Sequence, residues 1–167
     1  TDEDPVMSSP VLLQIDGEVA GKRAFTWEDL KAIDLQWQID DVSLVDPSRS
    51  GGAVWLRGIL EAAEVLPEAK YITLHSDRDD FHASLPLIEV HERGMFIYRN
   101  RNQPLPVTAG GPVRFFIRDH TACQATEVDE CANVKFVERI EFSRQKGFDN
   151  RPLDDAAHEA LHRQENH

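Results

Sequence analysis

The sequence predicts an α+β domain, a mixed β-sheet with short helices. Short apolar segments rich in β-branched residues recur along the chain, and turn residues separate them. Helical patterns occur among these segments without the regular alternation that a parallel α/β sheet requires. With 167 residues, 41% of them hydrophobic, the chain has the length and composition of one domain with a packed core.

The first part of the chain has strand signals on both sides of one helix signal. Residues 11–15 (VLLQI) form an apolar segment that ends at an Asp-Gly turn pair, which predicts a strand. Thr26 is followed by acidic residues at 28 and 29, an order typical of a helix N-terminus. The partly alternating stretch of residues 34–45 predicts one or two further strands.

The middle of the chain begins with a loop. Residues 46–52 (DPSRSGG) carry several turn signals at once. Residues 54–63 then predict a helix that ends before Pro67, and residues 71–76 (YITLHS) predict a strand. Residues 81–87 continue in an extended pattern.

Three more strands are predicted before the chain turns polar. They are residues 95–98, residues 113–117 after a Gly-Gly-Pro turn, and residues 134–142. Residues 153–164 predict one exposed helix. We therefore expect three regions, namely a loose lead-in (1–10), the domain itself (11–143) and a polar C-terminal tail (144–167).

Charge and hydropathy exclude two classes of partner. The formal net charge is −12, from 30 acidic and 18 basic residues, whereas nucleic-acid binders need a cationic face. No run of about twenty apolar residues occurs, so no membrane span is predicted. Because the sequence begins with Thr1, a cytoplasmic protein and an exported one with its signal peptide removed both stay open. We expect a soluble, acidic domain.

Several segments, taken in order, resemble one known family. They are VLLQIDG with FTWEDL (11–17, 25–30), LRGIL (56–60), HSDRDDFHASLP (75–86), NQPLP with GGPVR (102–106, 110–114) and NVKFVERIEF (133–142). This ordered set is similar to the oxidoreductase molybdopterin-binding domain family, of the sulfite-oxidase type. The resemblance covers residues 11–143 and implies that family's fold and its molybdopterin cofactor. It also implies that His75 and Ser76, at a strand end, and Lys135 bind the cofactor.

The sequence departs from this family at the metal. The family holds molybdenum by a cysteine thiolate in the loop before its "LRDLL" helix, and residues 42–52 of this chain contain no cysteine. Neither Asp46 nor Ser48 can replace a soft thiolate without changing the chemistry of the site. We therefore expect an oxidoreductase-type domain that is degenerate at the molybdenum site. It would keep a residual cofactor-binding or redox role, with a small molecule or a redox protein as partner. The alternative is a non-catalytic binding module on the same fold.

Residues 119–131 replace a short turn of the family and supply metal ligands of their own. His120, Cys123 and Cys131, with carboxylates between the cysteines, are the ligand types that zinc or iron uses. This loop suggests a metal-binding protein as a third reading. A Cys123–Cys131 disulfide and two unlinked buried thiols are the competing explanations.

Two further motifs have simpler explanations. Asp77, Asp79, Asp80 and His82 could attract a cation, although such a run is more often a solvated surface. Residues 158–162 read H-E-x-x-H, a zinc-protease spacing, but the chain around them is typical of an ordinary solvated helix.

Overall fold

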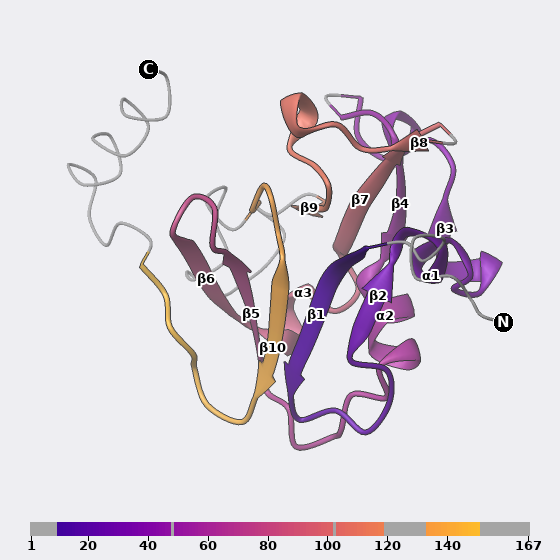
Figure 1. The fold of residues 1–167 in the computed structure, drawn as a ribbon. Helices are drawn as coiled ribbons and strands as arrows, with labels where there is room; N and C mark the ends of the chain where they lie inside the picture. The colour runs from indigo at the N-terminus through magenta and orange to yellow at the C-terminus, as the bar shows by residue number, and fades with distance from the viewer. Residues whose placement is uncertain (1–9, 48, 102, 119–132, 151–167) are drawn as a thin grey trace, which may run out of the picture.

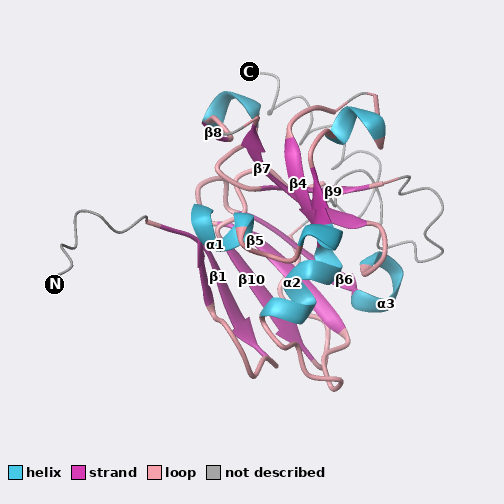
Figure 2. Cartoon of the chain, turned by 90° about the vertical axis from the view of Figure 1, so that its right-hand side faces the viewer, coloured by secondary structure: helices cyan, strands magenta, loops and turns pink. Residues whose placement is uncertain are grey.

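The chain folds around two β-sheets, with short helices beside them (Figures 1 and 2). The computed structural model describes residues 10–47, 49–101, 103–118 and 133–150. Within these ranges, no helix is long and apolar enough to cross a membrane. The α+β class with mixed strand directions is confirmed.

The first sheet has the strand order β2-β1-β10-β5-β6. Its strands are β1 (Val11–Gly17), β2 (Ala24–Thr26), β5 (Tyr71–Ser76), β6 (Phe81–Pro86) and β10 (Arg139–Ser143). β1 and β10 run parallel and the other neighbours are antiparallel, so segments from both ends of the described chain meet at the centre of this sheet.

The second sheet is antiparallel and centres on β7. Its strands are β3 (Gln38–Ile39), β4 (Gly52–Trp55), β7 (Gly94–Asn100), β8 (Gln103–Pro104) and β9 (Arg114–Ile117). β7 pairs with β4, β8 and β9. This arrangement brings the loop before β4 close to β9.

The helices are short, and the first begins where the sequence predicts it. They are α1 (Trp27–Lys31), α2 (Leu56–Ala62) and α3 (Leu87–Val90), together with the 3₁₀ turns η2 (Leu35–Trp37), η3 (Val42–Leu44) and η4 (Val107–Ala109). Thr26 Oγ1 accepts from the backbone N–H of Asp29 at 3.1 Å, and the Asp29 carboxylate accepts from the N–H of Thr26 at 3.0 Å. This reciprocal pair is a capping box, which confirms the predicted N-cap.

Three boundary predictions were wrong. Residues 34–45 contain one short strand, Gln38–Ile39, and are otherwise mostly 3₁₀ turns, because Asp34 and Asp41 accept from the backbone N–H two residues ahead and favour turns over strands. Residues 54 and 55 belong to a strand and the helix starts at Leu56, since β-branched Val54 pairs with Phe96 of β7. The last strand starts at Arg139 rather than at residue 134.

The main core fills the inner face of the first sheet. Ile72 and Leu74 of β5 and Ile140 and Phe142 of β10 are fully buried there, against Phe96 of the second sheet. Strand side chains alternate between faces. The residues between these core positions therefore lie on the outer face of the first sheet, where several polar side chains are also buried.

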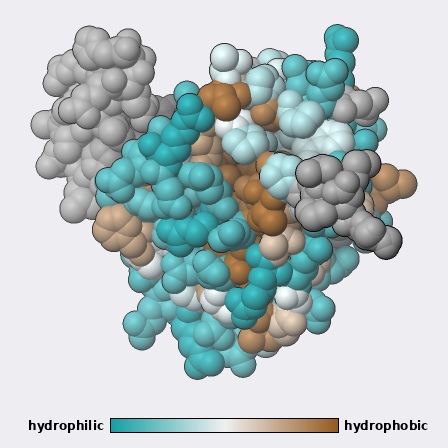
Figure 3. All heavy atoms as spheres, viewed as in Figure 1, coloured by the Kyte–Doolittle hydropathy of each residue, from teal (hydrophilic) through white to brown (hydrophobic). Residues whose placement is uncertain are grey.

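A C-terminal strap, residues 144–150, runs beside β6 after the chain leaves β10 (Figure 1). The face seen in that view is largely hydrophilic, with an apolar strip near its centre (Figure 3). The predicted helix of residues 153–164 and the motif of residues 158–162 lie outside the described residues, as does the lead-in apart from Pro10.

Candidate functional site

A cavity of about 160 Å³ opens on the outer face of the second sheet. Arg49 to Gly51 contribute from the loop before β4, Ile97 from β7, Leu105 from the chain after β8 and Arg114 from β9. Arg114 is the register partner of Ile97, so the two side chains share this face. The cavity thus combines an apolar floor with two arginines from distant parts of the sequence.

Both arginines carry a buried N–H group without a partner. Nε of Arg49 and Nε of Arg114 are inaccessible to solvent and make no hydrogen bond. The guanidinium of Arg49 lies over the ring of Phe116, 4.9 Å from its centroid, and Nη1 of Arg114 donates to Ala109 O at 3.3 Å. In the described part of the chain, neither arginine forms an ion pair. A buried donor without an acceptor is costly, so this pair is suited to an anion.

The electrostatics of the cavity agree with this interpretation. Burial lowers the pKa of Arg114, and the positive charge of Arg49 lowers it further. By contrast Arg99, a third arginine on this face, is fully engaged. It donates to Tyr98 Oη at 3.2 Å, to Ile39 O at 3.4 Å and to the Asp40 carboxylate at 3.2 Å. Unsatisfied donors are therefore a property of the Arg49–Arg114 cavity and not of the whole face.

A glycine turn lies against the Arg114 side chain, next to the cavity. Gly110 has φ +97°, a conformation that side chains rarely adopt, and a Cβ at Gly111 would collide with the carbonyl oxygen of Leu105. Cγ of Lys135 would lie 3.3 Å from a Cβ added at Gly110. The exposed Lys135 therefore sits beside this turn and adds a third cationic side chain near the cavity.

The sequence-predicted cofactor residues do not share one surface. His75 and Ser76 are adjacent on β5, so their side chains point to opposite faces of the first sheet. The Ser76 hydroxyl is buried and without a partner, whereas His75 contacts His82 and Glu141 on the outer face. Lys135 alone lies beside the Arg49–Arg114 cavity. The cofactor-binding role of all three residues stays a prediction.

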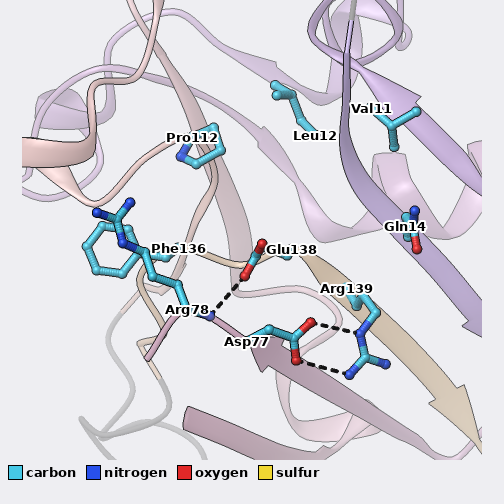
Figure 4. Close-up of a pocket in the computed structure, with 9 residues that line it drawn as sticks. All are labelled: Val11, Leu12, Gln14, Asp77, Arg78, Pro112, Phe136, Glu138 and Arg139. Carbon is cyan, nitrogen blue, oxygen red and sulfur yellow. Dashed lines mark hydrogen bonds and ion pairs between the residues drawn. The ribbon is translucent and has the colours of Figure 1, made fainter. Parts of the chain in front are cut away.

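A second, larger hollow of about 340 Å³ lies between the start of β1 and the turn after β5 (Figure 4). Asp77 accepts two hydrogen bonds from the Arg139 guanidinium, at 3.2 and 3.3 Å, and this pairing lowers the pKa of Asp77. Arg78 stacks on the ring of Phe136 and its backbone N–H donates to the Glu138 carboxylate at 3.1 Å. The carboxylates of Asp77 and Glu138 already accept hydrogen bonds, so this hollow has fewer free charged groups for a ligand than the Arg49–Arg114 cavity has.

Metal-ligand groups are not assembled in the described ranges. No group of three or more His, Cys, Asp or Glu side chains there could hold a metal ion. In the acidic turn, Asp77 pairs with Arg139 and Asp80 pairs with His82, so these residues do not converge on one point. His120, Cys123 and Cys131 lie outside the described residues, so the metal-binding role of their loop stays a prediction.

Sequence reasoning missed both arginines of the cavity. Arg114 is the last residue of the GGPVR segment, and Arg49 lies in the glycine-rich loop of residues 46–52. The available signal was one arginine in each of two glycine-containing segments, residues 46–52 and residues 110–114. The pairing of those motifs through β7 was not readable from the sequence.

Comparisons with known proteins agree with this architecture. The solved structure of the sulfane dehydrogenase SoxCD from Paracoccus pantotrophus is similar with a TM-score of 0.54 and 20% identity, which shows a shared fold. The match covers 80% of this chain and 38% of that one, so the present chain spans well under half the length of its structural relative. The comparison with curated proteins gives no match. The model of the oxidoreductase molybdopterin-binding domain family matches residues 51–150, and the chain therefore belongs to that family.

Proposed function

We propose that the chain binds a phosphorylated, molybdopterin-type ligand through the Arg49–Arg114 cavity, without the cysteine thiolate on which the family holds molybdenum. The unsatisfied N–H groups of the two arginines are the observation that carries this proposal. Family membership supplies the class of ligand.

The anionic part of molybdopterin fits the residues present. Arginine binds phosphate oxygens through a planar fork of N–H donors, and Arg49 and Arg114 bring two such side chains to one cavity. A phosphate between them would also relieve the repulsion between the two guanidinium groups. The exposed Lys135 beside the glycine turn is a further cation for the same ligand.

The metal part fits less well. Molybdenum on this cofactor would supply oxygen-transfer chemistry, and the family anchors it with a soft thiolate. The two cysteines of the chain, Cys123 and Cys131, both fall outside the loop of residues 42–52 where the family's ligand belongs. We therefore propose a domain that is degenerate at the molybdenum site, whose arginines bind and orient an anionic ligand. A small molecule or a redox protein would be its partner.

Pterin and metal content would test the two halves of the proposal separately. The protein is purified from a host that makes molybdopterin. Bound pterin is oxidised to its fluorescent form and counted, and molybdenum, zinc and iron are measured by elemental analysis. We expect pterin near one per chain with molybdenum well below that ratio. Arg49→Glu and Arg114→Glu should each lower the retained pterin at least tenfold, because each replaces a donor with a repelling charge.

Arg144→Glu is the matched control. It makes the same charge change in the strap, where Arg144 pairs with Glu18, and it should leave the pterin content unchanged. Wild-type protein without pterin would contradict the proposal and favour the non-catalytic binding module. Stoichiometric molybdenum that survives loss of both cysteines would overturn the degenerate metal site. Stoichiometric zinc or iron that disappears with the cysteines would favour the His120/Cys123/Cys131 reading instead.

A further inference from the structure

The outer face of the first sheet carries a buried polar network that the cavity does not use. His75 and Thr73 of β5 lie opposite His82 and Ser84 of β6. Nδ1 of His75 is 2.8 Å from Nδ1 of His82, and the Thr73 hydroxyl donates to the Ser84 hydroxyl at 3.0 Å. The two histidines are 5% and 7% exposed. Polar groups buried to this degree need every one of their partners.

The strap supplies the partners along the edge of the sheet. β6 is an edge strand, and its N–H groups at His82 and Ser84 donate to the side chains of Asn150 (2.9 Å) and Asp149 (3.0 Å). The Asn150 backbone N–H donates back to His82 O at 3.1 Å. The ring of Phe148 packs edge-on against the ring of His82, with 5.1 Å between centroids. The strap therefore covers an edge that would otherwise be open to another strand.

The contacts of the two imidazoles fix the number of their protons. One of the two facing Nδ1 atoms must carry a proton and the other a lone pair. Nε2 of His75 is 3.2 Å from the Glu141 carboxylate, and Nε2 of His82 is 3.1 Å from the Asp80 carboxylate. Ionised carboxylates only accept, so both Nε2 atoms donate. Three ring protons satisfy these contacts, and a fourth proton, on the free Nδ1 atom, breaks the contact between the two rings.

We propose that the His75–His82 pair is an acid-sensitive latch for the C-terminal strap. The strap is closed while one of the two facing Nδ1 atoms carries no proton. A proton on that atom places two N–H groups against each other across 2.8 Å, pushes the His82 ring toward Phe148 and releases the strap.

The charges around the pair set the direction of the pH response. Burial lowers the pKa of His75; its hydrogen bond with Glu141 opposes this, and the charges of Arg139 and His82 reinforce it. A positive charge is therefore disfavoured on the ring of His75. The other charged groups facing the pair are Asp77 and Asp80 in the turn and Asp149 in the strap.

The lowered pKa of His75 gives the sign of the effect. A released strap uncovers His82, the partner of His75 in the pair, and the pKa of His75 then returns toward its ordinary value of 6.5. The released form therefore binds protons before the closed form does. The stabilisation of the closed form is complete above pH 6.5 and is lost as the pH falls below that value.

Hydrogen exchange at the strap would test the latch. Protection of the N–H groups of His82, Ser84, Gly147 and Asn150 is followed from pH 7.5 to 5 and corrected for the intrinsic rate. Because one proton is linked to opening, protection should fall by up to about tenfold per pH unit below 6.5. The N–H groups of the β5–β10 ladder should not change with them.

His75→Gln separates the latch from a general acid effect. Its side-chain oxygen can accept from Nδ1 of His82 and its NH₂ group can donate to Glu141, but it takes up no proton in this range. The variant should keep the strap closed, with protection at pH 5 within about twofold of that at pH 7. His91→Gln, a surface control beside Glu92, should behave as the wild type does.

Two results would overturn the latch. One is wild-type strap protection that does not change with pH. The other is a His75→Gln variant that loses protection as the wild type does. If His75→Gln does not fold, the ring-nitrogen chemical shifts of the wild type at pH 7 decide. One ring with a protonated Nδ1 beside one ring without it supports the latch, and two rings that both lack a proton at Nδ1 refute it.

Discussion

The outer faces of the two sheets differ in whether their buried polar groups have hydrogen-bond partners. On the first sheet, Thr73, His75, His82 and Ser84 all have partners, and the strap completes the network. On the second sheet, the arginines of the Arg49–Arg114 cavity keep N–H groups without acceptors. A satisfied network contributes stability, whereas unsatisfied donors cost stability unless a ligand binds. This difference suits the first face to a structural role and the second face to the binding role that we propose.

The largest effect is expected where the satisfied face loses a shared acceptor. Ser84→Ala leaves the Thr73 hydroxyl and the Gly147 N–H, which donates to Ser84 Oγ at 2.8 Å, without a partner. We expect the free energy of unfolding to fall by about 2 kcal/mol, measured by urea denaturation. Ser43→Ala, which removes a hydroxyl exposed at a turn, is the control and should cost far less. Equal losses in the two variants would show that the outer-face network adds no stability.

A gain in stability is expected on the other face. Arg114→Met removes a buried, unpaired donor and its repulsion with Arg49 while keeping most of the side-chain volume. The ligand-free protein should become more stable by about 1 kcal/mol, as is common when a binding residue is lost. Arg99→Met is the matched control and should be destabilising, because its hydrogen bonds to Ile39 and Tyr98 are lost. If Arg114→Met and Arg99→Met lower the free energy of unfolding equally, Arg114 contributes to stability in the same way as the hydrogen-bonded Arg99.

Inorganic phosphate should show the same contrast with an effect of similar size. At a phosphate concentration several times its dissociation constant, wild-type protein should gain about 1 kcal/mol of stability, followed as a shift in melting temperature. Arg114→Met should gain less, since the variant lacks one of the two arginines of the proposed anion site. The same shift in both proteins would mean that phosphate acts elsewhere.

The sequence predicted the first sheet far better than the cavity. The alternating pattern of residues 71–76 and the Thr26 cap are local signals, and both elements form as expected. The parallel pairing of β1 with β10 joins residues more than a hundred positions apart, so no local pattern contained it. The cavity depends on the same kind of long-range pairing, through β7, which is why two ordinary arginines showed no sign of a shared site.

His75 shows how a motif can be placed correctly and its side chain misjudged. The "HS" pair lies at the end of a strand, as the family pattern implies. The pattern says nothing about which of two adjacent residues faces inward, and a shift of one position exchanges the faces of a strand. Only the burial of Leu74 within the core shows that His75 must point outward.

The smallest change in stability is expected at Ser76, which also has a buried polar atom without a partner in the described part of the chain. Unlike the arginines, it lies on the inner face of the first sheet, beside the core. Ser76→Ala removes a hydroxyl that makes no hydrogen bond, so the free energy of unfolding should stay within about 0.5 kcal/mol of wild type or rise slightly. Urea denaturation of this variant beside Ser84→Ala compares two buried serines on neighbouring strands. If Ser76 also contacts the ligand, as the family resemblance implies, Ser76→Ala should lower the retained pterin while leaving stability unchanged. A loss of about 2 kcal/mol would instead mean that the hydroxyl has a partner in solution, and Ser76 would then belong with the structural face.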